Sequence, residues 1–267
     1  MQNQIENFLK ENLDEGFLPI STCKKCMQRF SLTFREVEKS ALELGITPLR
    51  YKRNQSTISV QNQLKLFNSH VAIIGCGGLG GHISECLARI GIGELSLFDF
   101  DVFEEHNLNR QNFSHVNAIG RKKVEVVKEG LEKINPALHV NAYHHKFEPQ
   151  TDIKKLLHVN IVVDALDNPQ TKLELAFTCK KNSIDFVHGA IAGMNGQFST
   201  CNTLEHLYKD GGKGIEASIG NPSFSVTFAA SIQSAEVVKL LLSIGETLKE
   251  KILITNLAEN EFIQLEA

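Results

Sequence analysis

Two cations and one carboxylate, Arg110, Lys123 and Asp167, are the side chains of this chain best suited to chemistry, because they accompany a glycine-rich loop. The loop at residues 75–80 follows the apolar run 71–74. A tight glycine turn between a buried strand and a helix places backbone N–H groups against a phosphate, which alone indicates a nucleotide. Phosphoryl chemistry also requires charged groups, so the whole set predicts ATP and adenylyl transfer rather than hydride transfer. The candidate glycines are Gly75, Gly77, Gly78 and Gly80.

Asp99 ends the strand that is expected after the glycine loop, about twenty residues further on, where a carboxylate can accept both hydroxyls of a ribose. The alternative is a strand-end aspartate that caps the next turn. With the loop and Asp99 alone, an NAD-dependent enzyme would fit equally well.

The composition excludes several classes of protein. The chain has 267 residues, enough for one large domain with an appendage. A net charge of −3 predicts no surface for nucleic acid. No apolar stretch is expected to be long enough to span a bilayer, and the first twenty residues, which are polar and acidic, show no secretory signal. Six cysteines scattered through regular elements are typical of reduced thiols in a cytoplasmic protein.

Residues 1–48 and 49–267 differ in character and are expected to form a helical extension and a main domain. The extension predicts two short helices with Cys23 and Cys26 between them. Thr33 and Glu36 have the spacing of a capping box for the second helix. The polar residues 52–59 are interpreted as an arm that leads into the main domain.

From residue 61 onward, strands and helices alternate. This predicts an α/β, Rossmann-like fold: a mostly parallel sheet with helices on both faces, a C-terminal antiparallel extension, and a ligand beyond the carboxyl ends of the strands. A surface crossover loop is expected at 202–220 and a long buried helix at 226–242. The expected strands are 71–74, 94–98, 138–143, 160–165, 184–187 and 197–201, with a closing hairpin at 251–255 and 261–265.

From about residue 49 to its C-terminus the chain resembles the ThiF/MoeB/HesA superfamily, the bacterial relatives of ubiquitin-activating enzymes. One such motif would be a weak signal, but chance would not produce all of them in this order and spacing. The motifs are residues 50–53, the glycine loop, residues 99–101, residues 107–111, Gly120 with Lys123, residues 164–168, residues 189–190 and residues 196–197.

The resemblance implies that ATP adenylylates the C-terminal glycine carboxylate of a small ubiquitin-fold sulfur carrier ending in Gly-Gly. Pyrophosphate is released, and the pathway implied is thiamine, molybdopterin or related cofactor biosynthesis. Arg110 and Lys123 match phosphate clamps, and Asp167 matches the ligand of Mg²⁺. Arg53 matches an arginine that the family supplies across the interface of a homodimer. The other implied nucleotide contacts are Asp99, Asp101, Asn107 and Gln111.

The cysteines depart from the family pattern. Many members bind a structural zinc through two Cys-x-x-Cys pairs, whereas Cys23 and Cys26 form the only pair here, so zinc is not expected. No cysteine lies within the expected crossover loop, which favours adenylylation without a following thiol step. Cys76, Cys86 and Cys179 are interpreted as buried structural thiols, and Cys201 as a buried strand residue.

Three alternatives remain open. The first is an ATP-dependent enzyme of the same superfamily, similar to tRNA threonylcarbamoyladenosine dehydratase. The absence of a basic patch argues against it. The second is an NAD(P) oxidoreductase, which would leave Arg110, Lys123 and Asp167 without a role. The third is a scaffold that binds a ubiquitin-fold partner without catalysis, and the intact phosphate-site residues argue against that.

Overall fold

The structure is a computed structural model that describes residues 1–201, 204, 207–208 and 219–266. Most of the crossover loop expected at 202–220 therefore lies outside the described residues.

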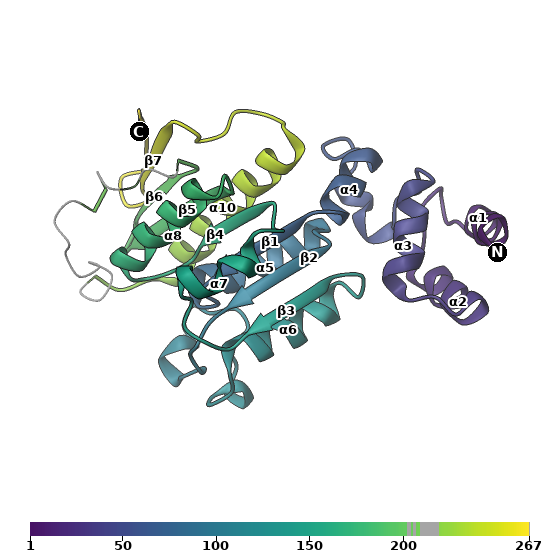
Figure 1. The fold of residues 1–267 in the computed structure, drawn as a ribbon, viewed down its shortest axis with the longest axis horizontal. Helices are drawn as coiled ribbons and strands as arrows, with labels where there is room; N and C mark the ends of the chain where they lie inside the picture. Colours follow the sequence, from purple (N-terminus) through teal and green to yellow (C-terminus); the bar gives the residue numbers. More distant parts are fainter. Residues whose placement is uncertain (202–203, 205–206, 209–218, 267) are drawn as a thin grey trace.

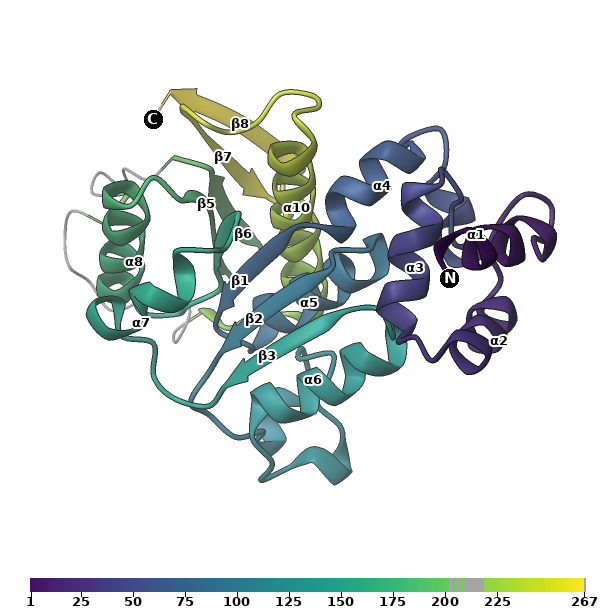
Figure 2. The ribbon, with the colours of Figure 1, turned by 45° about the vertical axis from the view of Figure 1, so that its right-hand side comes forward.

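Eight strands form one sheet in the order β3-β2-β1-β4-β5-β6-β7-β8 (Figures 1 and 2). The pairings from β3 to β5 are parallel, and those from β5 to β8 are antiparallel. The mostly parallel sheet with an antiparallel C-terminal extension is thus confirmed. The strands are β1 (His70–Ile74), β2 (Glu94–Phe98), β3 (His139–Tyr143), β4 (Ile161–Asp164), β5 (Asp185–Ala192), β6 (Asn195–Ser199), β7 (Lys251–Asn256) and β8 (Glu261–Glu266).

Helices cover both faces of the sheet, because alternate side chains of its central strands enter two different apolar clusters. Val71 and Ile73 of β1 pack with α5, α6 and α10 on one face. Ala72 and Ile74 pack with α7 and α8 on the other face (Figure 2). The helices of this part are α4 (Val60–Phe67), α5 (Gly78–Ile90), α6 (Lys123–Ile134), α7 (Pro149–Leu156), α8 (Pro169–Lys181) and α10 (Ser223–Leu242).

α10 is long and apolar enough, by length and composition alone, to cross a membrane. The sequence expectation that no stretch reaches that length was therefore wrong. Half of this apolar segment of α10 is buried inside the fold, where α10 lies against α5 and β5. Ala229, Ala230 and Val237 are fully buried there. These contacts describe a core helix of the sheet.

Three helices, not the expected two, precede residue 48: α1 (Gln2–Glu11), α2 (Ile20–Phe30) and α3 (Phe34–Glu43). Cys23 and Cys26 lie inside α2 rather than between helices, and both are buried. Cys23, Cys26, Met27 and Phe30 are spaced so that they share one face of α2, and that face packs into an apolar cluster. From the sequence, the cysteine pair was considered only as a possible metal motif, and this helical spacing was missed. Burial raises the pKa of Cys23 to about 12.

The predicted capping box at the start of α3 is confirmed. The Thr33 hydroxyl accepts from Glu36 N at 3.2 Å, and Glu36 Oε2 accepts from Thr33 N at 2.7 Å.

A short 3-10 helix, η1 (Leu49–Asn54), joins the helical extension to the main domain. It overlaps the start of the stretch 52–59 that was interpreted as an arm, and its Tyr51, just before that stretch, is buried. Arg50 forms an ion pair with Glu38 of α3 and donates to Asn135 Oδ1 at 2.9 Å. Asn135 in turn donates to the Tyr51 hydroxyl at 3.2 Å. The Glu38 side chain is fully buried, so the extension is held by a desolvated ion pair.

We expect Arg50→Met to lower the free energy of unfolding by about 3 kcal/mol, because it leaves the buried Glu38 carboxylate without its cation. Lys52→Met is the matched control on the same helix. Lys52 pairs with Glu15 at an exposed surface, where solvent screens the pair and its contribution to stability is small. Urea denaturation of both variants would test this, and equal losses of stability would contradict it.

Candidate active site

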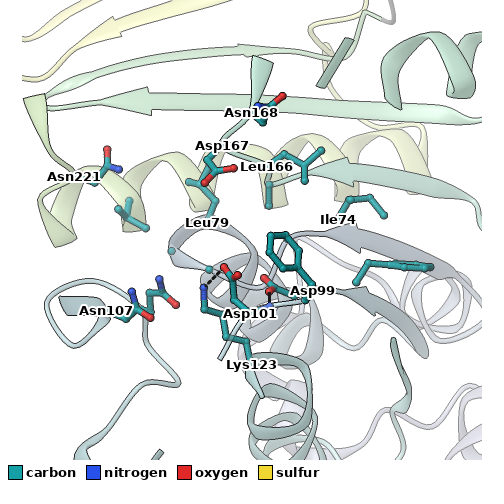
Figure 3. A pocket seen from close by; sticks show the side chains of 18 of the residues that line it. Ile74, Leu79, Asp99, Asp101, Asn107, Lys123, Leu166, Asp167, Asn168 and Asn221 are labelled. Carbon is teal, nitrogen blue, oxygen red and sulfur yellow. Dashed lines mark hydrogen bonds and ion pairs between the residues drawn. The ribbon is translucent and has the colours of Figure 1, made fainter. Parts of the chain in front are cut away.

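A cavity of about 440 Å³ lies beyond the carboxyl ends of β1, β2 and β4 (Figure 3). The sheet order reverses between β1 and β4, which is where open α/β sheets bind ligands. Most residues singled out in the sequence line this cavity, whereas Gly80 and Arg53 do not. Those that line it are Gly75, Gly77, Gly78, Asp99, Asp101, Asn107, Arg110, Gln111, Lys123 and Asp167.

The glycines of the loop serve two different purposes. Gly75 has a φ of +101°, and a Cβ there would lie 2.5 Å from the carbonyl oxygen of Ala165. A Cβ on Gly80 would collide with Gly75, so Gly80 closes the loop from behind. Gly77 is the N-cap of α5 and Gly78 its first residue, with no side chain capping the helix. The unpaired N–H groups of the first turn are therefore available to an anion in the cavity.

Asp99 caps the turn after β2, as in the alternative to a role in binding ribose. It also lines the cavity, so the two roles are compatible. Its carboxylate accepts Cys76 N and Asp101 N, each at 2.7 Å. Burial raises the pKa of Asp99, while these two hydrogen bonds and Lys123 oppose that shift. A carboxylate offers about four acceptor positions, so two remain for hydroxyl groups of a ligand.

Lys123 is the first residue of α6, and its ammonium lies 2.9 Å from Asp101 Oδ2. A cation is unfavourable at a helix N-terminus because the macrodipole is positive there. The Lys123 side chain is also nearly buried. Its position therefore requires an anion, which Asp101 provides here.

Arg110 lies in the loop after a short 3-10 helix, η2 (Glu105–Asn107). Its Nη1 donates to His106 O at 3.0 Å and to Asn109 Oδ1 at 2.8 Å. Among the described residues, its Nε and Nη2 have no hydrogen-bond partner, so these donors are available to a ligand.

Two amide side chains complete this side of the cavity. Asn107 Oδ1 accepts from Glu104 N at 3.0 Å, which fixes the side chain and leaves its NH₂ group to donate. Gln111 is buried beside Gly77, and its Oε1 accepts no hydrogen bond from the residues that the structure describes. A buried acceptor without a donor is costly, and a hydrogen-bond donor on a ligand would satisfy it.

Asp167 lies on the opposite side of the cavity, on the turn after β4 (Figure 3). Its side chain is exposed and forms no hydrogen bond or ion pair with the described part of the chain. The neighbouring Asn168, not Asp167, is the N-cap of α8 and accepts from Thr171 N at 3.0 Å.

The carboxylate of Asp167 fits a site for Mg²⁺. No cluster of three or more His, Cys, Asp or Glu side chains that could hold a metal occurs among the described residues. Mg²⁺ typically takes only one or two protein carboxylates and completes its shell with phosphate oxygens and water. Asp167 and a bound triphosphate would meet that requirement.

Sequence reasoning missed several residues that line the cavity. Lys146 and Phe147 follow β3, and Phe147 packs edge-on against Phe98 with ring centroids 5.3 Å apart. Asn221 and Val226 enter from the start of α10. The carboxyl end of the expected strand at 138–143 was the available signal for the first two, because that end of a parallel strand faces the ligand. No local sequence pattern placed Asn221 or Val226 at the cavity.

The cysteines differ in exposure. Cys76 and Cys179 are buried as expected, and burial raises the pKa of each thiol, that of Cys179 to about 12. Cys86 was expected in the core but is exposed, because it occupies the outward face of α5. Cys201 has intermediate exposure and lies beyond the end of β6 at Ser199, so it is not the buried strand residue that was expected.

We therefore expect iodoacetamide to alkylate Cys86 of the native protein at mildly alkaline pH while Cys76, Cys179 and Cys23 stay unmodified. Burial raises the pKa of all four thiols, Cys86 included, so exposure to the reagent and not thiolate content distinguishes Cys86 from the shielded cysteines. Peptide mass spectrometry would locate the label, with urea-unfolded protein as the control in which all six cysteines react. Rapid labelling of Cys76 in the native protein would contradict the described packing of the glycine loop.

Comparison with known proteins identifies the family of this fold and site. The family model described as the ThiF family matches residues 51–267. Molybdopterin-synthase adenylyltransferase of Haemophilus influenzae is 31% identical over 218 residues, covering 77% of this chain and 89% of that protein. tRNA threonylcarbamoyladenosine dehydratase of the same organism is 39% identical over 134 residues, covering 50% of this chain and 51% of its own length.

Among solved structures, E. coli MccB with succinimide superposes with a TM-score of 0.70 at 24% identity. The match covers 91% of this chain and 82% of that one, and it supports the fold. The motifs, the fold and these matches agree with one another. The chain therefore belongs to the ThiF family and is an adenylyltransferase.

Proposed function

We propose that the chain transfers the adenylyl group of ATP to the C-terminal glycine carboxylate of a small ubiquitin-fold sulfur carrier. The observation that carries this proposal is the distribution of charge in the cavity. Lys123 lies on the side of the cavity opposite Asp167, whose carboxylate has no partner among the described residues, and Arg110 and the N-terminus of α5 also line the cavity. A triphosphate bound there would meet cations, N–H donors and a metal ligand.

The reaction joins two anions, so its main requirement is positive charge. The carrier carboxylate forms a bond to the α-phosphorus, the bond from that phosphorus to the bridging oxygen breaks, and pyrophosphate leaves with the electron pair. No proton has to move, so positioning and electrostatics supply the catalysis. Arg110 can bridge two phosphate oxygens, and Lys123 acts as a point charge. Mg²⁺, when held by Asp167, supplies further positive charge at the phosphates.

The ion pair between Lys123 and Asp101 suits this role. Asp101 is about half exposed, whereas the Lys123 side chain is nearly buried. Before the nucleotide binds, Asp101 balances the buried ammonium. A phosphate group can then replace or share that contact, and the helix N-terminus that disfavours the cation favours the arriving anion.

The relative named molybdopterin-synthase adenylyltransferase supports a sulfur-carrier substrate, and thiamine or molybdopterin biosynthesis is the pathway class that we propose. We propose a cytoplasmic enzyme. The relative named tRNA threonylcarbamoyladenosine dehydratase supports a second candidate, an ATP-dependent enzyme acting on tRNA. ATP turnover that is stimulated by tRNA and not by a carrier ending in Gly-Gly would favour the second candidate.

We expect Asp167→Ala to reduce carrier-dependent exchange of radiolabelled pyrophosphate into ATP by about a hundredfold or more, since it removes the proposed metal ligand. Glu174→Ala is the control, because Glu174 is an exposed acid on α8 outside the cavity. Circular dichroism should show that both variants fold. Unchanged exchange in the Asp167 variant would remove this residue from the mechanism.

Arg53 is exposed on η1 and does not reach the cavity of its own chain. We therefore propose a homodimer in which Arg53 serves the partner's site. Co-expressing Arg53→Ala with Asp167→Ala should restore about a quarter of wild-type exchange, because random pairing leaves one intact site in half of the dimers. Each variant alone is the control. No recovery in a verified mixed dimer would show that Arg53 does not act in trans.

A further inference from the structure

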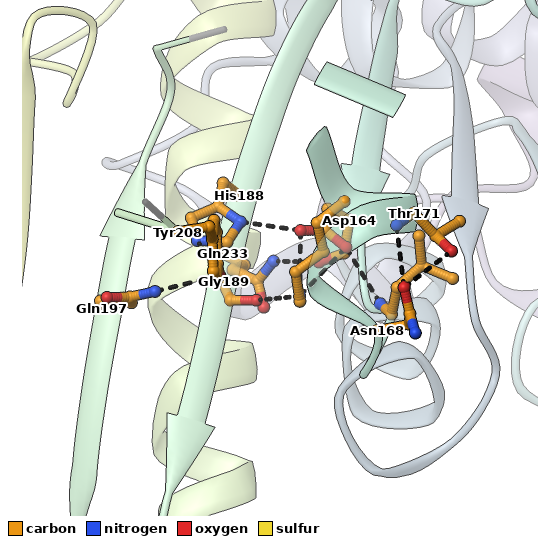
Figure 4. Close-up of polar contacts among 10 residues, drawn as sticks. Asp164, Asn168, Thr171, His188, Gly189, Gln197, Tyr208 and Gln233 are labelled. Atoms are coloured by element: carbon orange, nitrogen blue, oxygen red, sulfur yellow. Dashed lines mark hydrogen bonds and ion pairs between the residues drawn. The ribbon is translucent and has the colours of Figure 1, made fainter. Parts of the chain in front are cut away.

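A buried polar cluster lies directly behind the turn that carries Asp167 (Figure 4). We call it the Asp164 cluster, and it brings together side chains from β4, α8, β5, β6 and the segment after β6. Asp164 and His188 are fully buried, and Lys172 is almost so. None of the three lines the cavity. The cluster consists of Asp164, Lys172, His188, Gln197 and Tyr208.

Every acceptor of the Asp164 carboxylate is used. Lys172 Nζ donates to Oδ1 at 3.2 Å and to Oδ2 at 3.0 Å, and also to Gly189 O at 3.0 Å. His188 Nδ1 donates to Oδ2 at 2.7 Å. Leu166 N donates to Oδ1 at 3.0 Å. Burial alone would raise the pKa of Asp164, but Lys172 and His188 outweigh it and lower that pKa, so the carboxylate is charged.

The hydrogen bonds of the cluster have one consistent direction. Burial lowers the pKa of His188 despite its contact with Asp164, so the ring is neutral. Its Nδ1 carries the proton because its partner there, the ionised Asp164 carboxylate, can only accept, and Nε2 then accepts from the Tyr208 hydroxyl at 3.3 Å. Gln197 Nε2 donates to that hydroxyl at 3.0 Å. The chain of donors thus ends on Asp164.

The turn that carries Asp167 is held on two sides. Ala165 N donates to Ile74 O at 3.0 Å, and Ala165 O packs against Gly75 of the glycine loop. Behind the turn, Leu166 N is held by Asp164. Asp167 forms no hydrogen bond or ion pair of its own with the described residues, so its direction depends on the backbone on either side of it. Among the described contacts, only the hydrogen bond from Leu166 N ties that backbone to a buried charge.

We infer that Asp164 is a positioning residue that holds the Leu166–Asp167 backbone so that the Asp167 carboxylate faces the bound nucleotide and its metal. Lys172 and His188 keep the Asp164 carboxylate ionised and oriented in this role. The inference rests on the proposed function, because it assigns the cluster to the site that Asp167 forms. The cluster is more than a means of burying polar groups, since Asp164 accepts a hydrogen bond from the backbone N–H of Leu166, the residue next to Asp167.

The test measures how much Mg²⁺ improves the binding of mant-ATP, a fluorescent ATP analogue, relative to binding in EDTA. The main variant combines Asp164→Asn with Lys172→Met, which removes both buried charges together and leaves neither unpaired. We expect affinity in EDTA within about twofold of wild type, and a gain from Mg²⁺ that is about tenfold smaller. Lys172→Met alone is a second variant expected to act in the same direction, and Lys172→Arg should retain the gain.

Hydrogen–deuterium exchange gives a readout that needs no metal or turnover. In the double variant the Leu166 amide should exchange about tenfold faster, because its acceptor is weakened, while amides in the middle of α5 keep their wild-type rates. Unchanged exchange at Leu166 would overturn the inference.

Asp152→Asn is the matched control. Asp152 is also a buried aspartate that accepts from a histidine, a lysine and a backbone amide: His145, Lys155 and Glu148 N. It lies at the start of α7, away from the turn of Asp167. Its substitution should lower stability and leave the Mg²⁺ gain unchanged. An equal loss of the gain in Asp152→Asn would overturn a specific role for Asp164.

The two proposals fail in different ways. If Asp167→Ala loses the Mg²⁺ gain and the double variant keeps it, the role of Asp164 is overturned and the proposed function stands. If Asp167→Ala itself keeps the gain, the metal role of Asp167 in the proposed function is overturned, together with the inference built on it.

Discussion

The close approach of the glycine loop to the turn after β4 is the constraint on which the rest of this site depends. Gly75 has a left-handed backbone, and no side chain can stand between it and the Ala165 carbonyl. This contact sets the N-terminus of α5 beside the turn that carries Asp167. Positive partial charge and a carboxylate therefore face one cavity without touching each other. A ligand with several negative charges and a divalent cation can satisfy both sides.

The chemistry of the cavity was largely predictable from sequence, because the groups that face the ligand follow strand ends or begin helices. Asp99, Asp167 and the glycine loop are of this kind, and strand ends can be located from apolar runs. The cations Arg110 and Lys123 were assigned through the family resemblance, and the structure places both on the cavity. Which of these residues contact a ligand stays a prediction.

The remaining contacts join residues far apart in the chain, and no local pattern announces them. His188 is buried against Asp164, 24 residues away. The partners Lys172 and Gln197 carried no signal, because a lysine in a helix or a glutamine in a strand usually faces solvent. The helix α2 was missed for another reason. Its cysteines were interpreted through metal chemistry, although their spacing also fits an apolar helix face.

The 3-10 helix η1 has a practical consequence for dissecting this protein. It turns Arg50 inward, onto the buried Glu38, and leaves Arg53, three residues later, exposed to solvent. Deleting the first 48 residues would uncover the guanidinium of Arg50 and release the scaffold that orients Arg53. The properties of a shortened chain would therefore reflect the lost Arg50–Glu38 ion pair as well as the lost helices. Point substitutions at the surface of α1–α3 are the cleaner way to learn what the extension contributes.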